Sequence, residues 1–302
     1  MRRLIFLLLL FLVPSPFLRA EASVPLHRIA VMGAFSEEIA AIEKELLPVG
    51  TPLASQTING TRFDEADVNG KHYVFFLSGI SMVNAAMTTQ LALDRFHPDA
   101  VVFSGIAGGV DPSLLPGDVV VPAEWLHQME SAWINPDPAK PGAYVAEETR
   151  GTPSGHYGMM FFRDVRVVRD GEPQPTSRHA FPADPALLAV ARTVAAQGAP
   201  LEGGKNRPAK VVVGGRAMSG PVFLDNRDFR EFAFKQWQVE GHDMESTAVA
   251  QVCWVNQTPV LIVRGLSDLA GGQAGSNEIK KYVLLAAKNA AIVTARVLRA
   301  IP

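Results

Sequence analysis

The sequence of 302 residues predicts an α/β fold with a largely parallel central sheet. Three observations support this prediction. Short apolar runs, typical of buried strands, alternate with segments whose apolar residues recur at helical spacing. Glycine follows several of these runs and permits a sharp turn between strand and helix. The order strand, turn, helix then repeats along the chain, which is typical of parallel sheets with helical crossovers.

The first unit begins with an apolar strand over residues 28–32 and turns at Gly33. A helix over about 36–47 follows, because its apolar residues recur at helical spacing. Ser36 is the expected N-cap of this helix. Glu37 and Glu38 suit its first turn, where a carboxylate meets the positive end of the helix dipole.

The next units contain the same kinds of element. The expected order is a hairpin-like stretch over 57–70, a strand over 73–77, a helix over 82–96 ended by Pro98, a strand over 100–103 and a glycine-rich turn over 104–109. After a long irregular segment we expect a helix over 184–197, a strand over 211–213, a helix over 244–254, a strand over 260–263 and a closing helix over 279–300.

The irregular segment runs from about residue 124 to residue 175. Pro, Gly, Tyr, His and charged residues dominate it, and hydrophobic periodicity fades. We interpret it as a long excursion from the core and not as a second domain. It also contains Trp125, Trp133, Phe161 and Phe162, which is unusual for a solvated loop and predicts packing over a cleft or against a second subunit. A flap packed only on itself is the alternative.

The N-terminus has the parts of a secretory signal. Arg2 and Arg3 precede an apolar run over residues 4–13, and Ala20-Glu21-Ala22 provides a small-residue exit. About ten apolar residues would span only about half of a bilayer core. We therefore expect residues 1–22 to be a signal peptide and residues 23–302 to form one periplasmic or secreted domain. An uncleaved membrane anchor is the alternative.

The composition excludes several classes of partner. The formal net charge is −2 and both signs are mixed along the chain, so we expect no nucleic-acid surface. Cys253 is the one cysteine, which rules out a disulfide within the chain and makes a cysteine metal site improbable. We expect no metal, no cofactor and, after signal cleavage, no membrane association.

Polar residues follow several of the predicted strands. Glu38 comes just after the strand at 28–32, and Asp268 comes after the strand at 260–263. Open α/β sheets bind ligands at the carboxyl ends of their strands. Each residue alone has a simpler interpretation as a helix cap or a solvated loop residue, and the glycine-rich turn alone could serve close packing. Together they predict one cleft.

Five motifs occur in a characteristic order. They are Gly33-Ala34-Phe35-Ser36-Glu37-Glu38-Ile39, Ser78-Gly79-Ile80 with Val83-Asn84-Ala85-Ala86, Gly105-Ile106-Ala107-Gly108-Gly109 with Pro116-Gly117-Asp118, Asp243-Met244-Glu245-Ser246-Thr247-Ala248, and Val263-Arg264-Gly265-Leu266-Ser267-Asp268. This set resembles the 5'-methylthioadenosine/S-adenosylhomocysteine nucleosidases of the nucleoside phosphorylase/nucleosidase superfamily. The resemblance implies a three-layer α/β/α sandwich with a mixed, largely parallel sheet. The stretches 223–226 and 267–272 also resemble the exported plant bark-storage branch.

The resemblance implies a role for each site residue. Glu38 would activate the attacking water, and Asp268, held by Ser267, would protonate the purine at N7. Glu245 would bind the ribose hydroxyls, with Met244 beneath the sugar. The remaining substrate-binding residues would be Phe223, which stacks on the base, Leu224, whose backbone reads the base edge, and Ala107, Gly108 and Arg264.

The chemistry fits these residue types. Cleavage of a ribosidic bond leaves negative charge on the departing base, and a general acid contributes about 10²–10⁴-fold by protonating it. Asp268 would need a raised pKa to hold that proton near neutral pH. Glu38 must instead remain ionised, so the two carboxyl groups should lie in opposed environments, as in inverting glycosidases.

The leading interpretation is therefore hydrolysis of adenine-type nucleosides to free base and sugar by a homodimer. A nucleoside phosphorylase is the first alternative, although Glu37 and Glu38 occupy the turn where a phosphate dianion would need basic residues. Arg264 could supply such charge or could simply pair with a carboxylate such as Glu245. A non-catalytic exported nucleoside-binding or storage protein is the second alternative.

Overall fold

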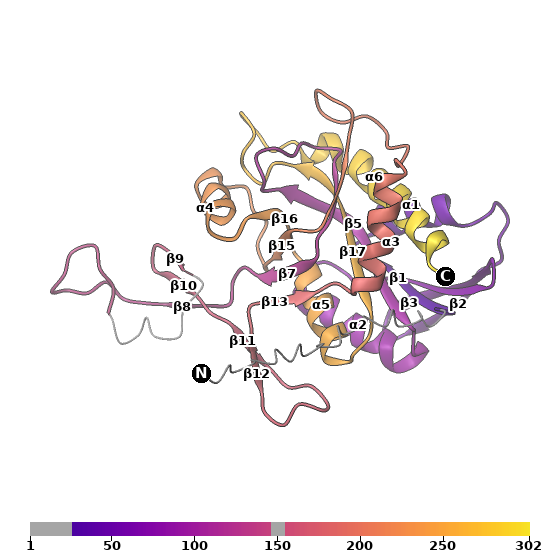
Figure 1. Ribbon diagram of the computed structural model, residues 1–302, viewed down its shortest axis with the longest axis horizontal. Coiled ribbons are helices and arrows are strands. Elements are labelled where there is room, and N and C mark those ends of the chain that lie inside the picture. Colours follow the sequence, from indigo (N-terminus) through magenta and orange to yellow (C-terminus); the bar gives the residue numbers. More distant parts are fainter. Residues whose placement is uncertain (1–25, 146–154) are drawn as a thin grey trace, which may run out of the picture.

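A twisted sheet runs through the molecule, and helices cover both of its faces (Figure 1). The computed structural model describes residues 26–145 and 155–302. The predicted signal peptide, residues 1–22, lies outside the described residues. The helices are α1 Ser36–Leu46, α2 Met82–Phe96, α3 Pro185–Ala196, α4 Arg227–Trp237, α5 Ser246–Val255 and α6 Ile279–Ala300. Within the described ranges, none of these helices combines the length and apolarity that a membrane span requires.

The strands fall into one large sheet and two small ones. The large sheet has the path β13 Ala180–Pro182, β7 Glu124–His127, β15 Arg216–Ser219, β16 Val239–Asp243, β5 Ala100–Gly109, β1 Arg28–Gly33, β4 Lys71–Leu77, β3 Thr61–Val68 and β2 Ala54–Ile58. Three further strands join it off this path, namely β17 Val260–Asp268, β6 Val119–Val121 and β14 Val211–Val213. The small sheets contain β8 Ser131–Trp133, β9 His156–Tyr157 and β10 Met160–Phe162, and β11 Val165–Val167 with β12 Thr176–Arg178.

The central strand pairs are parallel, as predicted. β1 runs parallel to β4 and β5, and β5 runs parallel to β17. The pair β16–β5 is antiparallel, as is β17–β6, so the sheet is mixed. Because β5 is long, its first half lies between β1 and β17, whereas its last residues lie between β16 and β17.

Two apolar cores cover the two faces of the sheet, and β1 contributes to both. Ile29 and Val31 pack with α1, α3 and α6, whereas Ala30 and Met32 pack with α2 and α5. Successive side chains of a strand point to opposite faces, which explains the alternation. Figure 1 shows α1, α3 and α6 on one side of the sheet and α2 and α5 on the other. The predicted three-layer α/β/α sandwich is confirmed.

Some predicted element boundaries were wrong. Residues 104–109 are not a turn but the second half of β5, and residues 264–268 continue β17. Ser36 does not cap α1: Phe35 is the N-cap residue, and the Ser36 hydroxyl donates to the Glu37 carboxylate at 2.8 Å. The helix predicted from Met244 begins at Ser246, and α4 was not predicted.

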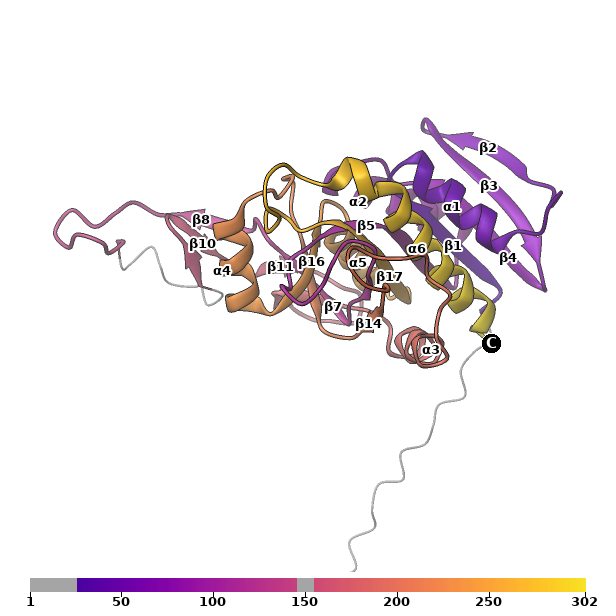
Figure 2. The ribbon, with the colours of Figure 1, turned by 90° about the horizontal axis from the view of Figure 1, so that it is seen from above.

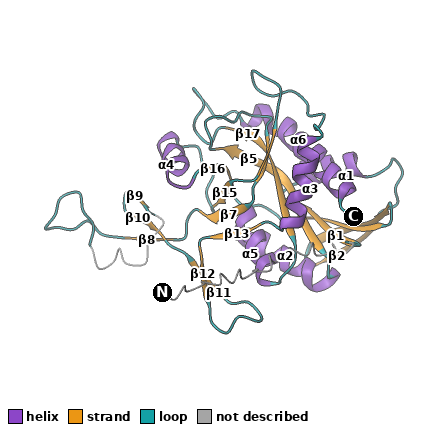
Figure 3. Cartoon of the chain, in the orientation of Figure 1, coloured by secondary structure: helices purple, strands orange, loops and turns teal. Residues whose placement is uncertain are grey.

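The excursion begins later than predicted. Residues 124–127 form β7 inside the large sheet, and Trp125 is fully buried there. The described residues between β7 and β13 are mostly loop with short strands (Figure 3). Its small sheet of β8, β9 and β10 projects from the body of the molecule (Figures 1 and 2).

The root of this projection is anchored on α4. The ring of Phe162 packs edge-on against Trp237, and the ring of Tyr157 packs edge-on against Phe229. Phe162 is fully buried, whereas Trp133, on β8, is 63% exposed. The segment therefore packs partly on the body of the protein and is not a flap packed only on itself.

Candidate active site

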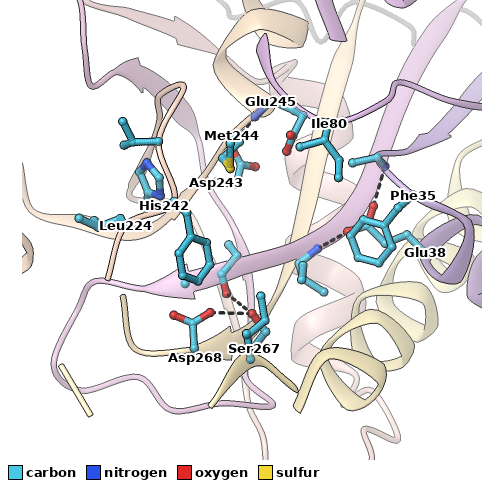
Figure 4. A pocket seen from close by; sticks show the side chains of 17 residues that line it. Phe35, Glu38, Ile80, Leu224, His242, Asp243, Met244, Glu245, Ser267 and Asp268 are labelled. Carbon is cyan, nitrogen blue, oxygen red and sulfur yellow. Dashed lines mark hydrogen bonds between the residues drawn. The ribbon is translucent and has the colours of Figure 1, made fainter. Parts of the chain in front are cut away.

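One cavity gathers most of the residues singled out in the sequence. It measures about 180 Å³ and lies at the carboxyl ends of β1, β5 and β17 (Figure 4). It is lined by Ala34, Phe35, Glu38, Ile80, Ile106, Ala107, Gly108, Val222, Phe223, Leu224, His242, Asp243, Met244, Glu245, Ser267, Asp268 and Ile279. The prediction that the polar residues after several strands converge on one cleft is confirmed.

Glu38 lies in the first turn of α1 and is 2% exposed. Its Oε2 accepts a hydrogen bond from the backbone N–H of Ala34 at 2.6 Å, and its Oε1 accepts one from Ile106 at 2.8 Å. Burial raises the pKa of Glu38 to about 7, against the opposing charge of Arg264 and these backbone donors. A carboxylate with this pKa can take a proton near neutral pH.

Asp268 lies at the end of β17 and is 2% exposed. Its Oδ1 accepts a hydrogen bond from the backbone N–H of Ala270 at 2.8 Å. Burial raises its pKa, against the hydrogen bonds from Ala270, Ser267 and Asn277. A carboxyl group that retains its proton more readily than usual suits a general acid.

The Ser267 hydroxyl lies 2.9 Å from Asp268 Oδ2 and 3.3 Å from the carbonyl oxygen of Ala107. It can donate to the ionised carboxylate. When Asp268 is protonated, the hydroxyl can instead accept from the acid and donate to the Ala107 carbonyl. Ser267 can therefore satisfy both protonation states of Asp268 without moving far.

A β-bulge explains why two consecutive residues face the same cavity. The pairing of β17 with β5 shifts register between Leu266 and Asp268, so Asp268 lies opposite Gly108. In a regular strand the side chains of Ser267 and Asp268 would point to opposite faces. The bulge re-aims one of them, a device that is common beside active sites.

Glu245 and Met244 line the cavity between β16 and α5. One carboxylate oxygen of Glu245 accepts a hydrogen bond from the backbone N–H of Ser81 at 2.6 Å. Burial and the neighbouring Asp243 raise the pKa of Glu245 to about 7. Its second oxygen remains available to a polar group in the cavity, such as a sugar hydroxyl.

The other end of the cavity contains Phe223 and Leu224, on the loop between β15 and α4. Phe223 is 56% exposed, whereas Leu224 is buried. Ala107 and Gly108, on β5, also line the cavity. An aromatic side chain that is half exposed above an apolar cavity is well placed to stack on a flat ring that enters it.

Arg264 does not line this cavity. It is fully buried, its Nε donates to Asp243 Oδ2 at 2.7 Å, and its guanidinium stacks on the Phe103 ring at 3.8 Å. Both Nε and Nη2 also donate to the Ser246 hydroxyl. The predicted direct contact with substrate is therefore wrong, and its carboxylate partner is Asp243 and not Glu245.

The prediction that Glu38 and Asp268 lie in opposed environments is also wrong. Burial raises the pKa of Glu38 as well as that of Asp268. Both carboxyl groups are buried and line the same apolar cavity, so desolvation raises the pKa of both. The two can still divide acid and base roles, because their hydrogen-bond partners differ.

Several residues that line the cavity were not predicted as site residues, notably Phe35, Ile80 and His242. His242 lies in β16 and directly precedes the Asp243-Met244-Glu245 motif, so its position beside that motif was the available signal. Among the residues that the structure describes, no group of three or more His, Cys, Asp or Glu side chains is placed to hold a metal ion.

Comparison with known proteins identifies the family of the chain. The phosphorylase superfamily model matches residues 28–300. The chain belongs to the phosphorylase superfamily. It is 31% identical over 264 residues to a 5'-methylthioadenosine/S-adenosylhomocysteine nucleosidase of Geobacillus kaustophilus, and the match covers 87% of this chain and 92% of that protein. The predicted kinship with these nucleosidases is confirmed.

Solved structures of superfamily members share the fold. A 5'-methylthioadenosine/S-adenosylhomocysteine nucleosidase from Colwellia psychrerythraea, in complex with adenine, superposes with a TM-score of 0.66 at 25% identity and covers 91% of this chain and 96% of its own. A futalosine hydrolase of Helicobacter pylori superposes with a TM-score of 0.68 at 20% identity, with 91% of this chain and 98% of its own covered. The second likeness supports the fold alone.

Proposed function

We propose that this superfamily member hydrolyses the N-ribosidic bond of adenine-type nucleosides, such as 5'-methylthioadenosine and S-adenosylhomocysteine, and releases the free purine. The observation that carries the proposal is the pair of buried carboxyl groups, Glu38 and Asp268, on one apolar cavity. The kinship with nucleosidases supports this chemistry.

The residues of the cavity divide the reaction between them. The base stacks against Phe223, and the ribose hydroxyls bind the free oxygen of Glu245. Asp268 transfers its proton to the leaving purine as the bond to C1' breaks. Glu38 takes a proton from the water that attacks C1', so nucleoside and water yield base and free sugar.

Hydrolysis is favoured over phosphorolysis by the charge of the cavity. The described lining residues include acidic side chains and no lysine or arginine. Arg264, the nearest candidate, is already held by Asp243 and Ser246. A bound phosphate dianion needs several donors and compensating charge, which this lining does not offer.

One assay separates the three candidate functions. Purified protein is incubated with 5'-methylthioadenosine, with and without inorganic phosphate, and adenine release is followed. Release without phosphate supports the hydrolase. Release that depends on phosphate would mean a phosphorylase, and binding without turnover would mean a storage or binding protein.

We propose further that the protein is exported. The positive start at Arg2 and Arg3, the apolar run over 4–13 and the Ala20-Glu21-Ala22 exit support cleavage near Ala22. N-terminal sequencing of secreted or periplasmic protein should begin close to Ser23. A chain that still starts at Met1 in the membrane fraction would contradict this.

We also propose a homodimer whose interface lies beside the cavity. Ile80 lines the cavity and is exposed, and Val83 and Met87 continue an exposed apolar row along α2, with Val83 79% exposed. Apolar side chains one helical turn apart are typical of a helix that packs against a partner. The expected result is a dimeric mass by light scattering, which Val83→Glu should lower. A wild-type protein of monomeric mass would contradict the proposal.

A further inference from the structure

Three residues on neighbouring strands share one row of the sheet. Gly108 of β5 pairs with His242 of β16 on one side and with Asp268 of β17 on the other. All three line the cavity. Directly opposite residues of paired strands project to the same face, so His242 and Asp268 flank a residue that has no side chain.

Gly108 keeps the space between them open. A Cβ at this position would lie 3.0 Å from Asp268 Oδ1 and 3.2 Å from the Ala270 Cβ. Neighbouring strands lie about 4.8 Å apart, so the backbones of His242 and Asp268 are separated by roughly 10 Å across the row. A flat bicyclic base lying over Gly108 would therefore present opposite edges to the two side chains.

His242 carries an unused hydrogen-bonding atom. The side chain is 4% exposed, and its Nε2 has no hydrogen-bond partner among residues 26–145 and 155–302. Burial lowers the pKa of His242 to about 4, against the nearby charge of Asp243, so the ring is neutral at pH 7. A buried polar atom without a partner costs free energy unless something in the cavity satisfies it.

We propose that His242 is a specificity-determining residue that hydrogen-bonds the edge of the purine opposite the edge that Asp268 protonates. The inference rests on the proposed function, since it takes a purine as the occupant of the cavity. The ligand class is a purine with a ring nitrogen on its pyrimidine side, because that nitrogen accepts a hydrogen bond and the uncharged imidazole can donate one when Nε2 carries its proton. His242 would act on binding of the base, while Asp268 acts on its departure.

The test uses free bases and therefore does not depend on turnover. Adenine, 1-deazaadenine, 3-deazaadenine and 7-deazaadenine are titrated calorimetrically into wild-type protein and the His242→Leu and His242→Gln variants. In wild type, loss of the nitrogen that meets His242 should weaken binding about 3- to 10-fold, the usual range for one hydrogen bond. His242→Leu should bind adenine and that same analogue equally.

Two controls make the result interpretable. 7-Deazaadenine alters the edge of the base that faces Asp268. Its loss of affinity relative to adenine should therefore be the same in wild type and in both variants. If His242→Leu does not fold, His242→Gln keeps a polar side chain of other geometry and should change which analogue is penalised. The inference would be overturned if the folded variants bound the three deaza analogues, relative to adenine, with the same affinities as wild type.

The outcomes also separate this inference from the proposed function. His242-dependent discrimination with no cleavage of 5'-methylthioadenosine would support the inference and contradict the hydrolase. Cleavage with no His242-dependent discrimination would do the reverse. Wild-type protein that binds no purine would overturn both.

Discussion

The guanidinium of Arg264 and the carboxylate of Glu38 both lie against Gly105, where a side chain would begin. A side-chain carbon at position 105 would overlap Arg264 Nη1 and Glu38 Oε1. The positive charge lowers the pKa of Glu38 while burial raises it. Arg264 thus influences the cavity electrostatically, although it does not line the cavity.

The first prediction concerns this contact. Gly105→Ala should retain the fold and lose most hydrolysis, because the methyl group must displace Glu38 or Arg264. Gly203→Ala is the control, since a Cβ at Gly203 meets no atom of the described residues within 4 Å. Adenine release by both variants, with melting temperatures, is the measurement. Wild-type activity in Gly105→Ala would show that the placement of Glu38 is not critical.

The second prediction concerns the general acid. Asp268→Asn keeps the shape of the side chain but supplies no transferable proton. Turnover should fall about 10²–10⁴-fold, the usual contribution of a positioned acid. Ser267→Ala should cost less, because it removes only a hydrogen bond to Asp268. Equal adenine release by wild type and Asp268→Asn would exclude the proposed role.

The third prediction compares two adjacent glutamates. Glu38→Gln should abolish hydrolysis, because the amide cannot take a proton and can accept only one of the two backbone hydrogen bonds from Ala34 and Ile106. Glu37→Gln should be nearly silent, since Glu37 is exposed. Turnover at saturating nucleoside is measured for both, with adenine binding as a separate readout. A dead Glu37→Gln beside a normal Glu38→Gln would reverse the assignment.

The fourth prediction concerns pH. A base must be ionised, so kcat/KM should rise with pH through about 7 as Glu38 loses its proton. Stability should move the opposite way. The folded pKa of about 7 exceeds the unfolded value of 4.5, so the folded state binds more protons between these values and loses stability as pH rises.

This loss amounts to about 3 kcal/mol for a shift of that size. Glu38→Gln has no titrating group, so its melting temperature relative to wild type should improve from pH 5 to pH 8. Thermal unfolding of both proteins across this range is the measurement. A constant difference in melting temperature would mean that Glu38 has an ordinary pKa.

The fifth prediction compares two aromatic residues of the excursion: Phe162, which packs against α4, and Trp133, which is exposed on β8. Phe162→Ala should destabilise the protein by about 3–5 kcal/mol, because Phe162 is fully buried against α4. Trp133→Ala should leave unfolding unchanged, because Trp133 is largely exposed. Denaturant unfolding measures both, and light scattering adds the mass. A lower mass for Trp133→Ala would place the tip of the excursion in a dimer interface.

Much of the fold was predictable because its signals are local. The strand at 28–32, the helix at 82–96 and the closing helix at 279–300 follow from apolar periodicity, and Pro98 marks a true helix end. The boundaries that failed depend on tertiary contacts. Residues 104–109 were predicted to form a turn because glycine tolerates the backbone conformations that turns need. In the structure β16 and β17 pair with these residues and extend β5.

The site was predictable in its membership but not in its electrostatics. Motif order brought Glu38, Glu245 and Asp268 together correctly. It could not show that Arg264 forms its ion pair with Asp243, since that pairing depends on the approach of β16 to β17 across β5. Nor could it show that burial raises the pKa of both Glu38 and Asp268.

The anchoring of the excursion on α4 has a kinetic consequence. The loop that carries Phe223 and Leu224 leads directly into α4, and the rings of Tyr157 and Phe162 are packed against that helix. Strain applied to the projecting strands would pass through α4 to the loop that contributes Phe223 and Leu224 to the cavity. Changes in the excursion should therefore alter how long the freed purine resides in the cavity while leaving the bond-breaking step unaltered.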